Sequence, residues 1–141
     1  DFRRSRGLGD VYKRQGKAVA DEKDPQLISG AAGVASCIGA DFAKVNYPNN
    51  FSGMTRPESL AIASQAAGRT GIICSGGGTL PPEEFLQRLW EQMNTGNCRG
   101  AATGRNIHQK DTSSAVKMTA ACHAIICNGA SVAEALEIFN S

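Results

Sequence analysis

The sequence lacks several features that would fix a function class at once. No apolar run approaches the roughly 20 residues that a bilayer-spanning helix requires. No Gly-x-Gly-x-x-Gly fingerprint opens a helix, and no lysine follows a glycine-rich loop in the pattern of a nucleotide-binding P-loop. No signal peptide is recognisable at the N-terminus. These absences argue against a membrane partner and against a nucleotide ligand.

The sequence also lacks the cysteine spacing of a zinc site. No Cys-x-x-Cys pair occurs, and Cys122 and Cys127 have only His123 nearby as a further ligand. An odd number of cysteines outside a disulfide framework fits a reducing cytosol. We expect a cytoplasmic protein without a metal or other cofactor, whose cysteines are reduced, buried and structural: Cys37, Cys74, Cys98, Cys122 and Cys127.

The first fifteen residues differ in origin from the rest. Residues 5–15, Ser-Arg-Gly-Leu-Gly-Asp-Val-Tyr-Lys-Arg-Gln, are those that a common transposase sequencing adaptor encodes, in the same order. A match of this length by chance is negligible. We therefore predict that residues 1–15 are an adaptor-derived tail, and that residues 16–141 form one partial domain with a real core.

Without that tail the chain is no longer basic. The whole chain has 15 Lys and Arg against 13 Asp and Glu, a formal charge of +2. Residues 16–141 keep ten basic and eleven acidic residues, a formal charge of −1. The charge therefore gives no reason to expect nucleic acid or an anionic membrane as a partner.

What the sequence does contain is an alternation of helical and strand patterns. We expect helices over 24–38, 57–67, 79–94, 113–127 and 131–139, and strands over 41–47, 70–74 and 100–104. Short connections between them imply parallel strands with right-handed crossovers. Either a doubly wound sheet or part of a barrel satisfies this pattern. Only three strands are clear, and a complete eight-stranded barrel needs about 250 residues, so we predict the C-terminal half of a (β/α)8 barrel.

Lys44 is the first candidate site residue. The segment Ala-Asp-Phe-Ala-Lys-Val-Asn-Tyr-Pro (40–48) has the pattern of a buried strand with this lysine in its middle. Burial in a low-dielectric site lowers the pKa of an ammonium group and makes the amine a nucleophile for carbonyl carbons. The alternative is a strand-end lysine whose amine reaches water.

Two glycine-rich strand ends follow Lys44. They are Ser75-Gly76-Gly77-Gly78 and Gly104-Arg105-Asn106, and such ends bind phosphate through backbone N–H groups. An amine nucleophile followed by two phosphate cradles indicates Schiff-base chemistry on a phosphorylated sugar. The partner that we expect is therefore a small-molecule sugar phosphate.

Three segments together resemble the class I fructose-bisphosphate aldolases of the bacterial and archaeal (DhnA) type. They are GKAVADEKDPQLISGAAGVASCIGADFAKVNYP (16–48), AAGRTGIICSGGG (66–78) and GAATGRNIHQ (100–109). The resemblance implies a (β/α)8 barrel of which this chain carries strands six to eight. Lys44 matches the Schiff-base lysine of the family, and the residues that match its phosphate site are Ser75, Gly76, Gly77, Gly104 and Arg105.

The reaction that this resemblance implies is cleavage of fructose 1,6-bisphosphate to dihydroxyacetone phosphate and glyceraldehyde 3-phosphate, by a homo-oligomer when full length. The family takes its general base from a Tyr-Pro-Arg-Gly motif. Gly16 matches the last residue of that motif, and the preceding places hold Lys13-Arg14-Gln15. We therefore expect the fragment itself to be inactive. Tyr47 is not a substitute because it is expected on the other face of the strand, and we expect His123 in the core.

Two alternatives keep the fold but change the function. One is a related lysine-dependent thiolase or aldolase that acts on another phosphorylated sugar. The other is a non-catalytic half-barrel that binds a sugar phosphate or pairs with itself to complete a barrel. Substrate profiling separates the first alternative from the aldolase, and concentration-dependent folding of residues 16–141 would support the second.

Overall fold

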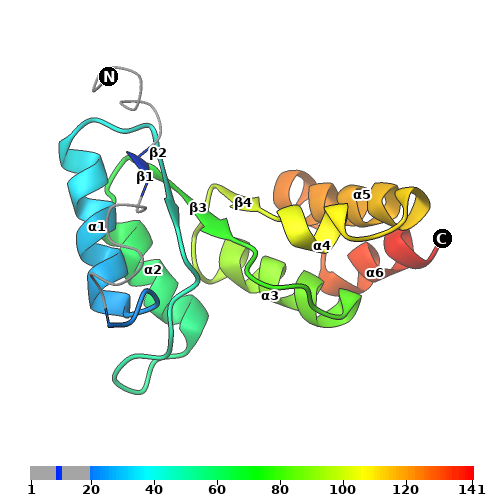
Figure 1. Ribbon diagram of the computed structural model, residues 1–141, viewed down its shortest axis with the longest axis horizontal. Helices are drawn as coiled ribbons and strands as arrows, with labels where there is room; N and C mark the ends of the chain where they lie inside the picture. Colours follow the sequence, from blue (N-terminus) through cyan, green and yellow to red (C-terminus); the bar gives the residue numbers. More distant parts are fainter. Residues whose placement is uncertain (1–8, 11–19) are drawn as a thin grey trace.

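The computed structural model describes residues 9–10 and 20–141. Helices and strands alternate along most of this length, and the chain ends in three consecutive helices (Figure 1). The strands are β1 (Gly9–Asp10), β2 (Phe42–Val45), β3 (Gly71–Ser75) and β4 (Gly100–Ala102). The helices are α1 (Pro25–Cys37), α2 (Arg56–Ala66), α3 (Pro82–Asn94), α4 (Gly104–His108), α5 (Thr112–Asn128) and α6 (Val132–Asn140).

All five predicted helices are present, while two strands are shorter than predicted. The last strand ends at Ala102 because the chain turns at once into α4, a five-residue helix that the sequence analysis did not predict. Strand β2 ends at Val45, before the predicted limit at residue 47. Beyond the strand, Arg56 binds two backbone carbonyls of this segment: its Nε donates to Pro48 O at 2.7 Å, and its Nη2 donates to Tyr47 O at 3.2 Å.

Polar side chains fix where most helices begin. Asp24 accepts the N–H of Gln26 at the start of α1, with proline in the first helical position. Asp111 accepts the N–H of Ser114 at the start of α5. Ser131 and Glu134 form a reciprocal capping box on α6. None of the described helices combines the length and the hydrophobicity needed to cross a membrane.

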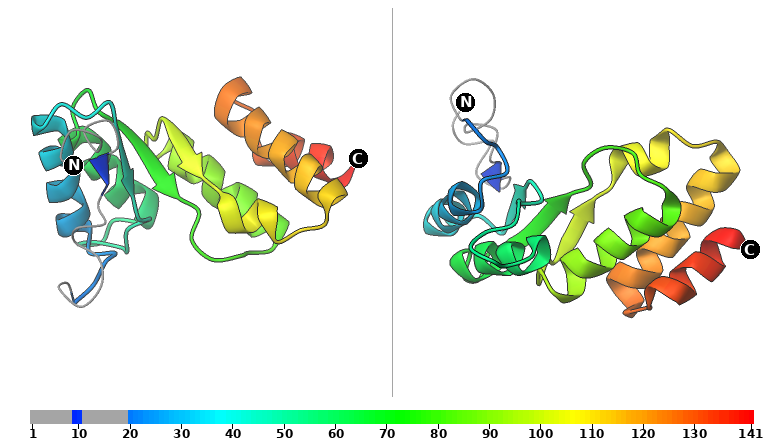
Figure 2. Two further views of the ribbon diagram at one scale, coloured as in Figure 1. Left: turned by 45° about the horizontal axis from the view of Figure 1, so that its top comes forward. Right: turned by 90° about the horizontal axis from the view of Figure 1, so that it is seen from below.

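The sheet is parallel throughout, in the order β1-β2-β3-β4. Each described strand therefore lies beside the strand that precedes it in the sequence, and the order across the sheet always advances in the same direction. Right-handed crossovers that advance in this way put their helices on one face of the sheet, and α1, α2 and α3 follow one another along that face (Figure 2). A doubly wound sheet reverses its strand order at a switch point, and the described strands contain no reversal.

Strand β1 lies inside the segment that we assigned to the tail. It pairs Gly9 with Ala43 and Asp10 with Lys44, so the sheet has four strands where the sequence predicted three. An open strand edge presents unpaired N–H and C=O groups that any extended segment can satisfy. The pairing of β1 with the edge of β2 is therefore compatible with a segment that is not part of the native sequence.

Two hydrophobic clusters hold the described helices. The first joins α1 and α2 to β2 and β3, with Ile28, Leu60 and Ile72 almost fully buried. The second joins α3, α5 and α6, with Leu86 and Met118 at its centre. Met93 packs against both clusters, so the α1–α2 block and the α3–α6 block are connected through α3.

Candidate active site

A pocket of about 590 Å³ lies at the carboxyl ends of the strands. Parallel strands bring these ends to one edge of the sheet, which is where parallel α/β folds bind their ligands. All six residues that the sequence analysis selected line this pocket: Lys44, Ser75, Gly76, Gly77, Gly104 and Arg105. The spacing in the sequence thus predicted which residues come together, although the roles assigned to them remain predictions.

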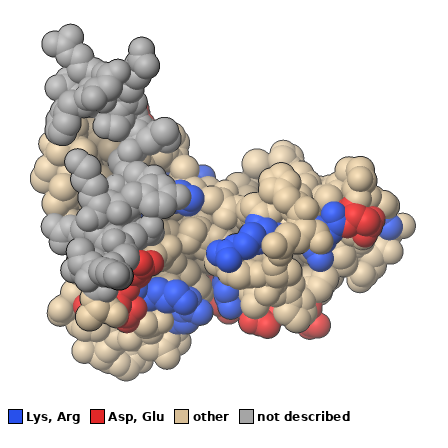
Figure 3. Space-filling model, in the orientation of Figure 1, with Lys and Arg blue, Asp and Glu red and all other residues tan. Residues whose placement is uncertain are grey.

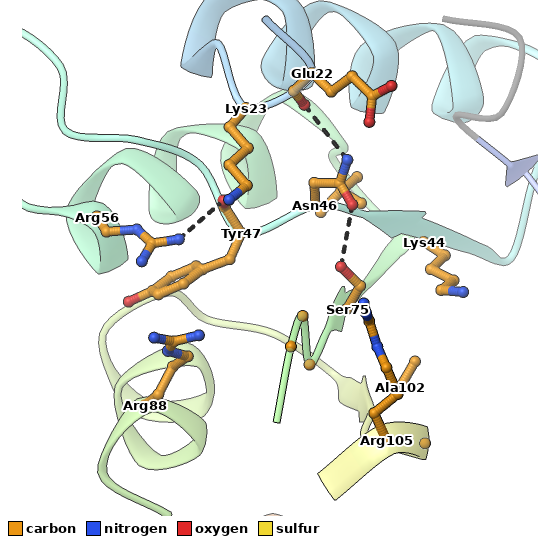
Figure 4. A pocket seen from close by; sticks show the side chains of 15 residues that line it. Glu22, Lys23, Lys44, Asn46, Tyr47, Arg56, Ser75, Arg88, Ala102 and Arg105 are labelled. Carbon is orange, nitrogen blue, oxygen red and sulfur yellow. Dashed lines mark hydrogen bonds between the residues drawn. The ribbon is translucent and has the colours of Figure 1, made fainter. Parts of the chain in front are cut away.

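The expected burial of Lys44 is wrong. Strand β2 has two faces: Ala43 and Val45 are almost fully buried in the first hydrophobic cluster, whereas Phe42 and Lys44 are exposed on the opposite face. The helices that cover this part of the sheet, α1 and α2, pack on the Ala43 side. Lys44 therefore projects from the other side, where it lines the pocket at the edge of the group of side chains shown in Figure 4. This exposure agrees with the alternative of an amine that reaches water.

The first glycine-rich segment is held against β4 by its backbone. The N–H of Gly76 donates to Ala102 O at 2.8 Å. A Cβ at Gly76 would lie 3.0 Å from Ala102 O and 3.2 Å from Thr103 Cα, so glycine permits this close approach. Gly77 has φ +70°, a conformation that L side chains rarely adopt. The segment thus needs glycine at both positions, for two different reasons.

Asn106 fixes the same segment from α4, and sequence reasoning missed this role. Its side chain is 1% exposed. Oδ1 accepts the N–H of Leu80 at 2.9 Å, and Nδ2 donates to Gly78 O at 3.0 Å. Both glycine-rich strand ends are therefore tied together by one buried amide. The partners lie 26 and 28 residues away, so no local spacing could have revealed the pair.

Asn46 connects β2 to the same segment. The hydroxyl of Ser75 donates to Asn46 Oδ1 at 3.1 Å, and Asn46 Nδ2 donates to the backbone carbonyl of Glu22 at 3.5 Å (Figure 4). Asn46 stands two residues after Lys44 and, like Glu22, lines the pocket. The lysine strand and the glycine-rich segment are thus linked by a side-chain hydrogen bond that the sequence analysis did not anticipate.

Tyr47 and two arginines form another wall of the pocket. The guanidinium carbon of Arg56 lies 4.1 Å from the centroid of the Tyr47 ring, and that of Arg88 lies 5.9 Å from it. The Tyr47 hydroxyl donates to Glu91 Oε2 at 3.4 Å. Burial, and then the negative charge of Glu91, raise the pKa of this phenol well above its ordinary value. Tyr47 therefore keeps its proton near neutral pH.

The pocket favours an anionic ligand. Among the described residues, its charged lining consists of five cations and one acid: Lys23, Lys44, Arg56, Arg88, Arg105 and Glu22. Figure 3 shows Lys and Arg side chains gathered around the middle of the molecule, between the α1–α2 block and the α3–α6 block. Burial, and then the charge of Arg88, lower the pKa of Arg56. Such a concentration of positive charge attracts phosphate groups.

The remaining candidates lie outside this pocket, and two predictions about them are wrong. His123 is exposed on α5 and is not a core residue, because the buried face of α5 is formed by its neighbours Cys122 and Ala124. Cys37 and Cys127 are also exposed. The predicted burial holds for the other three cysteines, and all five are unpaired thiols. Contact with Cys98 and burial raise the pKa of the Cys74 thiol.

Comparison with known proteins identifies the relatives of this chain. The sequence model of the DeoC/LacD aldolase family matches residues 11–110. The fructose-bisphosphate aldolase/6-deoxy-5-ketofructose 1-phosphate synthase of Methanocaldococcus jannaschii is 53% identical over 125 residues, which are 89% of this chain and 39% of that protein. The class 1 fructose-bisphosphate aldolase of Halobacterium salinarum is 33% identical over 122 residues, which are 86% of this chain and 43% of that protein.

Solved structures agree with the sequence relatives. A fructose-bisphosphate aldolase from Slackia heliotrinireducens superimposes with a TM-score of 0.85 at 52% identity, over 89% of this chain and 40% of that one. An archaeal fructose-1,6-bisphosphate aldolase, solved with its catalytic lysine covalently bound to a carbinolamine intermediate, gives 0.68 at 26% identity, over 79% of this chain and 41% of that one. The chain spans about two fifths of the length of the proteins that it matches. Since the family match extends over more than half of its residues, the chain belongs to the DeoC/LacD family of aldolases.

Proposed function

We propose that residues 16–141 are the C-terminal half of a Schiff-base aldolase barrel, carrying its sixth to eighth strands, and that residues 1–15 are an adaptor-derived tail. The whole barrel cleaves fructose 1,6-bisphosphate to dihydroxyacetone phosphate and glyceraldehyde 3-phosphate in the cytoplasm, as a homo-oligomer. One observation carries the proposal: Lys44 shares a cationic pocket with both glycine-rich strand ends. The one-directional strand order supports the barrel, because a barrel adds each strand next to the one before it.

Lys44 supplies the nucleophile in this mechanism. Its neutral amine attacks the ketone carbon of the substrate, and loss of water from the resulting carbinolamine gives an iminium ion. When the bond between the third and fourth carbons breaks, its electron pair moves toward the iminium nitrogen. The fourth-carbon hydroxyl loses its proton to a general base, and this carbon becomes the aldehyde of the first product. Protonation and hydrolysis of the enamine then release dihydroxyacetone phosphate.

The glycine-rich strand ends hold the phosphate next to the ketone. Arg105 stands in the first turn of α4, at the pocket, where its guanidinium can pair with phosphate oxygens. Ser75, Gly76, Gly77 and Gly104 are assigned to the same phosphate by their resemblance to the family. The Gly76 N–H is already bonded to Ala102 O, so its contribution is to shape the segment and bring β4 close.

None of the described pocket residues matches the tyrosine that serves as general base in the family. Tyr47 has a raised pKa and faces Glu91, and Lys13-Arg14-Gln15, at the place of the family tyrosine, lie outside the described residues. We therefore expect little or no turnover from the 141-residue chain. Turnover comparable to that of the full-length relatives would contradict this expectation.

The test uses a completed barrel, in which the N-terminal part of the M. jannaschii relative is joined ahead of Gly16. Incubation with dihydroxyacetone phosphate and borohydride should leave a reduced adduct on Lys44, located by peptide mass spectrometry. Lys44→Arg should abolish the adduct and lower turnover roughly 10⁴-fold or more, as loss of a covalent nucleophile does. Lys23→Arg, in the same pocket, is the matched control and should keep both. An active barrel without an adduct on Lys44 would disprove the assignment.

A second candidate function is aldol transfer to a different acceptor. The observation that favours it is the second activity in the name of the M. jannaschii relative, a 6-deoxy-5-ketofructose 1-phosphate synthase. The same iminium and enamine chemistry at Lys44 serves both reactions, so the adduct cannot separate them. Product analysis of the completed barrel with a range of aldehydes and phosphorylated ketoses would show which reaction dominates.

A further inference from the structure

The hydrogen bond between Ser75 and Asn46 has a defined direction. A serine hydroxyl carries one proton, and an amide presents one acceptor end and one donor end. In the pocket the Ser75 hydroxyl donates to Asn46 Oδ1 at 3.1 Å, and the other end of the amide donates to the Glu22 carbonyl at 3.5 Å. The chain of donors therefore runs from Ser75 through Asn46 to the backbone of Glu22 (Figure 4).

The Glu22 carbonyl sets this direction. Rotating the Asn46 amide by half a turn would place its oxygen against the carbonyl oxygen, so that two acceptors would face each other. The observed orientation avoids this and aims Oδ1 at Ser75. The single proton of Ser75 is thereby committed to Asn46, and only oxygen lone pairs are left to face a ligand.

Lone pairs on Ser75 suit a ligand that donates a hydrogen bond. Phosphate oxygens are acceptors, so they gain nothing from an oxygen that has already given its proton away. We propose that Asn46 is a positioning residue that makes the Ser75 hydroxyl an acceptor for a substrate hydroxyl, so that Ser75 contributes only its backbone to the phosphate site, where backbone N–H groups and Arg105 hold the phosphate. This inference rests on the proposed function, because that function supplies the hydroxyl-bearing ketone.

The substrate class follows from the same geometry. Lys44 pairs with Ile73 in the sheet register, and Ser75 lies two residues farther toward the pocket. A ketone bound to Lys44 with its phosphate in the cradle therefore passes close to Ser75. The matching ligands are ketose phosphates with a free hydroxyl next to the carbonyl carbon. Dihydroxyacetone phosphate has this hydroxyl, and hydroxyacetone phosphate lacks it.

The first test reads the hydrogen bond directly in the 141-residue chain. Accepting a hydrogen bond moves a carbonyl ¹³C resonance downfield, so the Asn46 Cγ resonance should shift upfield in the Ser75→Ala variant. Asn49 lies three residues along the chain and donates to Asp21 instead, so its Cγ resonance should stay in place. An unchanged Asn46 resonance would overturn the proposal, whatever the enzyme does.

The second test separates hydroxyl recognition from phosphate binding. Inorganic phosphate is titrated into the parent chain, Ser75→Ala and Asn46→Leu. We expect the dissociation constants of the variants to stay within about twofold of the parent value, because no neutral hydrogen bond to phosphate is lost. The matched control is Asn49→Leu, in the same segment but outside the pocket lining. A tenfold loss in Ser75→Ala, with the control unchanged, would show that the hydroxyl donates to phosphate and would refute the inference.

The third test uses the completed barrel and the two ketones. Borohydride trapping on Lys44 should favour dihydroxyacetone phosphate over hydroxyacetone phosphate by about 3- to 10-fold, the value of one neutral hydrogen bond. Ser75→Ala and Asn46→Leu should bring this ratio close to one.

The outcomes distinguish this inference from the proposed function. If neither ketone leaves an adduct on Lys44, the proposed aldolase function fails, and the Asn46 resonance still decides whether Ser75 is held as an acceptor. If adducts form but Ser75→Ala keeps the parent ratio, the aldolase function stands and the role of Asn46 is refuted. Asn49→Leu should behave as the parent does in every measurement.

Discussion

The two ends of the pocket differ in how completely the described residues build them. At the β3–β4 end, Asn106 and the Gly76–Ala102 hydrogen bond fix the glycine-rich segment from α4 and β4. At the β2 end, Lys44 is exposed, and the edge of its strand that faces away from β3 is covered only by the two-residue strand β1. The described residues thus assemble the proposed phosphate cradle, whereas they do not enclose the lysine. Variants at the two ends should therefore have different consequences.

The largest effect should come from Asn106→Ala at the cradle end. This change leaves the Leu80 N–H and the Gly78 carbonyl without their buried partner, which should lower the free energy of unfolding by about 3 kcal/mol. It should also weaken phosphate binding, because the glycine-rich segment loses its support. Urea unfolding and phosphate titration of the 141-residue chain measure the two effects.

Asn94→Ala is the control for that variant. Asn94 is exposed at the end of α3, where its side chain donates to the Trp90 carbonyl. Its removal should change the free energy of unfolding by less than about 0.5 kcal/mol and leave phosphate binding unaltered. Equal losses in both variants would mean that the buried amide of Asn106 has no special role in the cradle.

Arg56→Ala probes the lysine end and should have a smaller effect. The substitution removes the donors to Pro48 O and Tyr47 O and the contact with the Tyr47 ring. We expect a loss of about 2 kcal/mol in the free energy of unfolding and a modest loss of phosphate affinity, because one of the five described pocket cations is removed. Arg69→Ala, at an exposed position, should be neutral. If Arg56→Ala abolished phosphate binding, the two ends of the pocket would not be independent.

A third pair of variants tests the close approach of β3 and β4. Gly76→Ala places a Cβ 3.0 Å from Ala102 O, which should lower the free energy of unfolding by about 1–2 kcal/mol and weaken phosphate binding. Gly78→Ala meets nothing within 4 Å and has no positive φ, so it should be neutral or slightly stabilising. A Gly76→Ala chain as stable as Gly78→Ala would show that the strands can separate without cost.

Most of what the sequence predicted correctly depends on local pattern. Helices were predictable because proline, capping side chains and apolar periodicity mark their starts and faces, as Asp24 and Pro25 do for α1. The meeting of Lys44 with the two glycine-rich segments was predictable because parallel strands align their carboxyl ends. The short helix α4 was missed since its five residues follow a run of small residues with no periodic signal.

What the sequence could not predict depends on long-range contacts. Asn46 and Asn106 act through partners 24 to 29 residues away, and nothing in the spacing points to those partners. The exposure of Lys44 depends on which face of β2 the helices cover. His123 lies in an apolar helix but on its exposed side, because α3 and α6 cover only part of the surface of α5. The burial of a side chain therefore depends on which neighbouring elements pack against it, and the apolar pattern of one helix does not give this information.

The smallest effect should lie on α6, away from both ends of the pocket, and it provides a baseline. Hydrogen bonds from the Ser131 N–H and hydroxyl, each 2.8 Å long, hold the pKa of Glu134 below its ordinary value of 4.5. A depressed folded-state pKa stabilises the fold fully above pH 4.5, and this contribution disappears as pH falls through the folded-state value. Glu134→Gln should therefore flatten the acid limb of the stability profile between the two values, measured by urea unfolding at a series of pH values. Glu137→Gln, on the same helix but outside the capping box, should keep the parent slope, and a parent-like slope in Glu134→Gln would mean that the box does not form in solution.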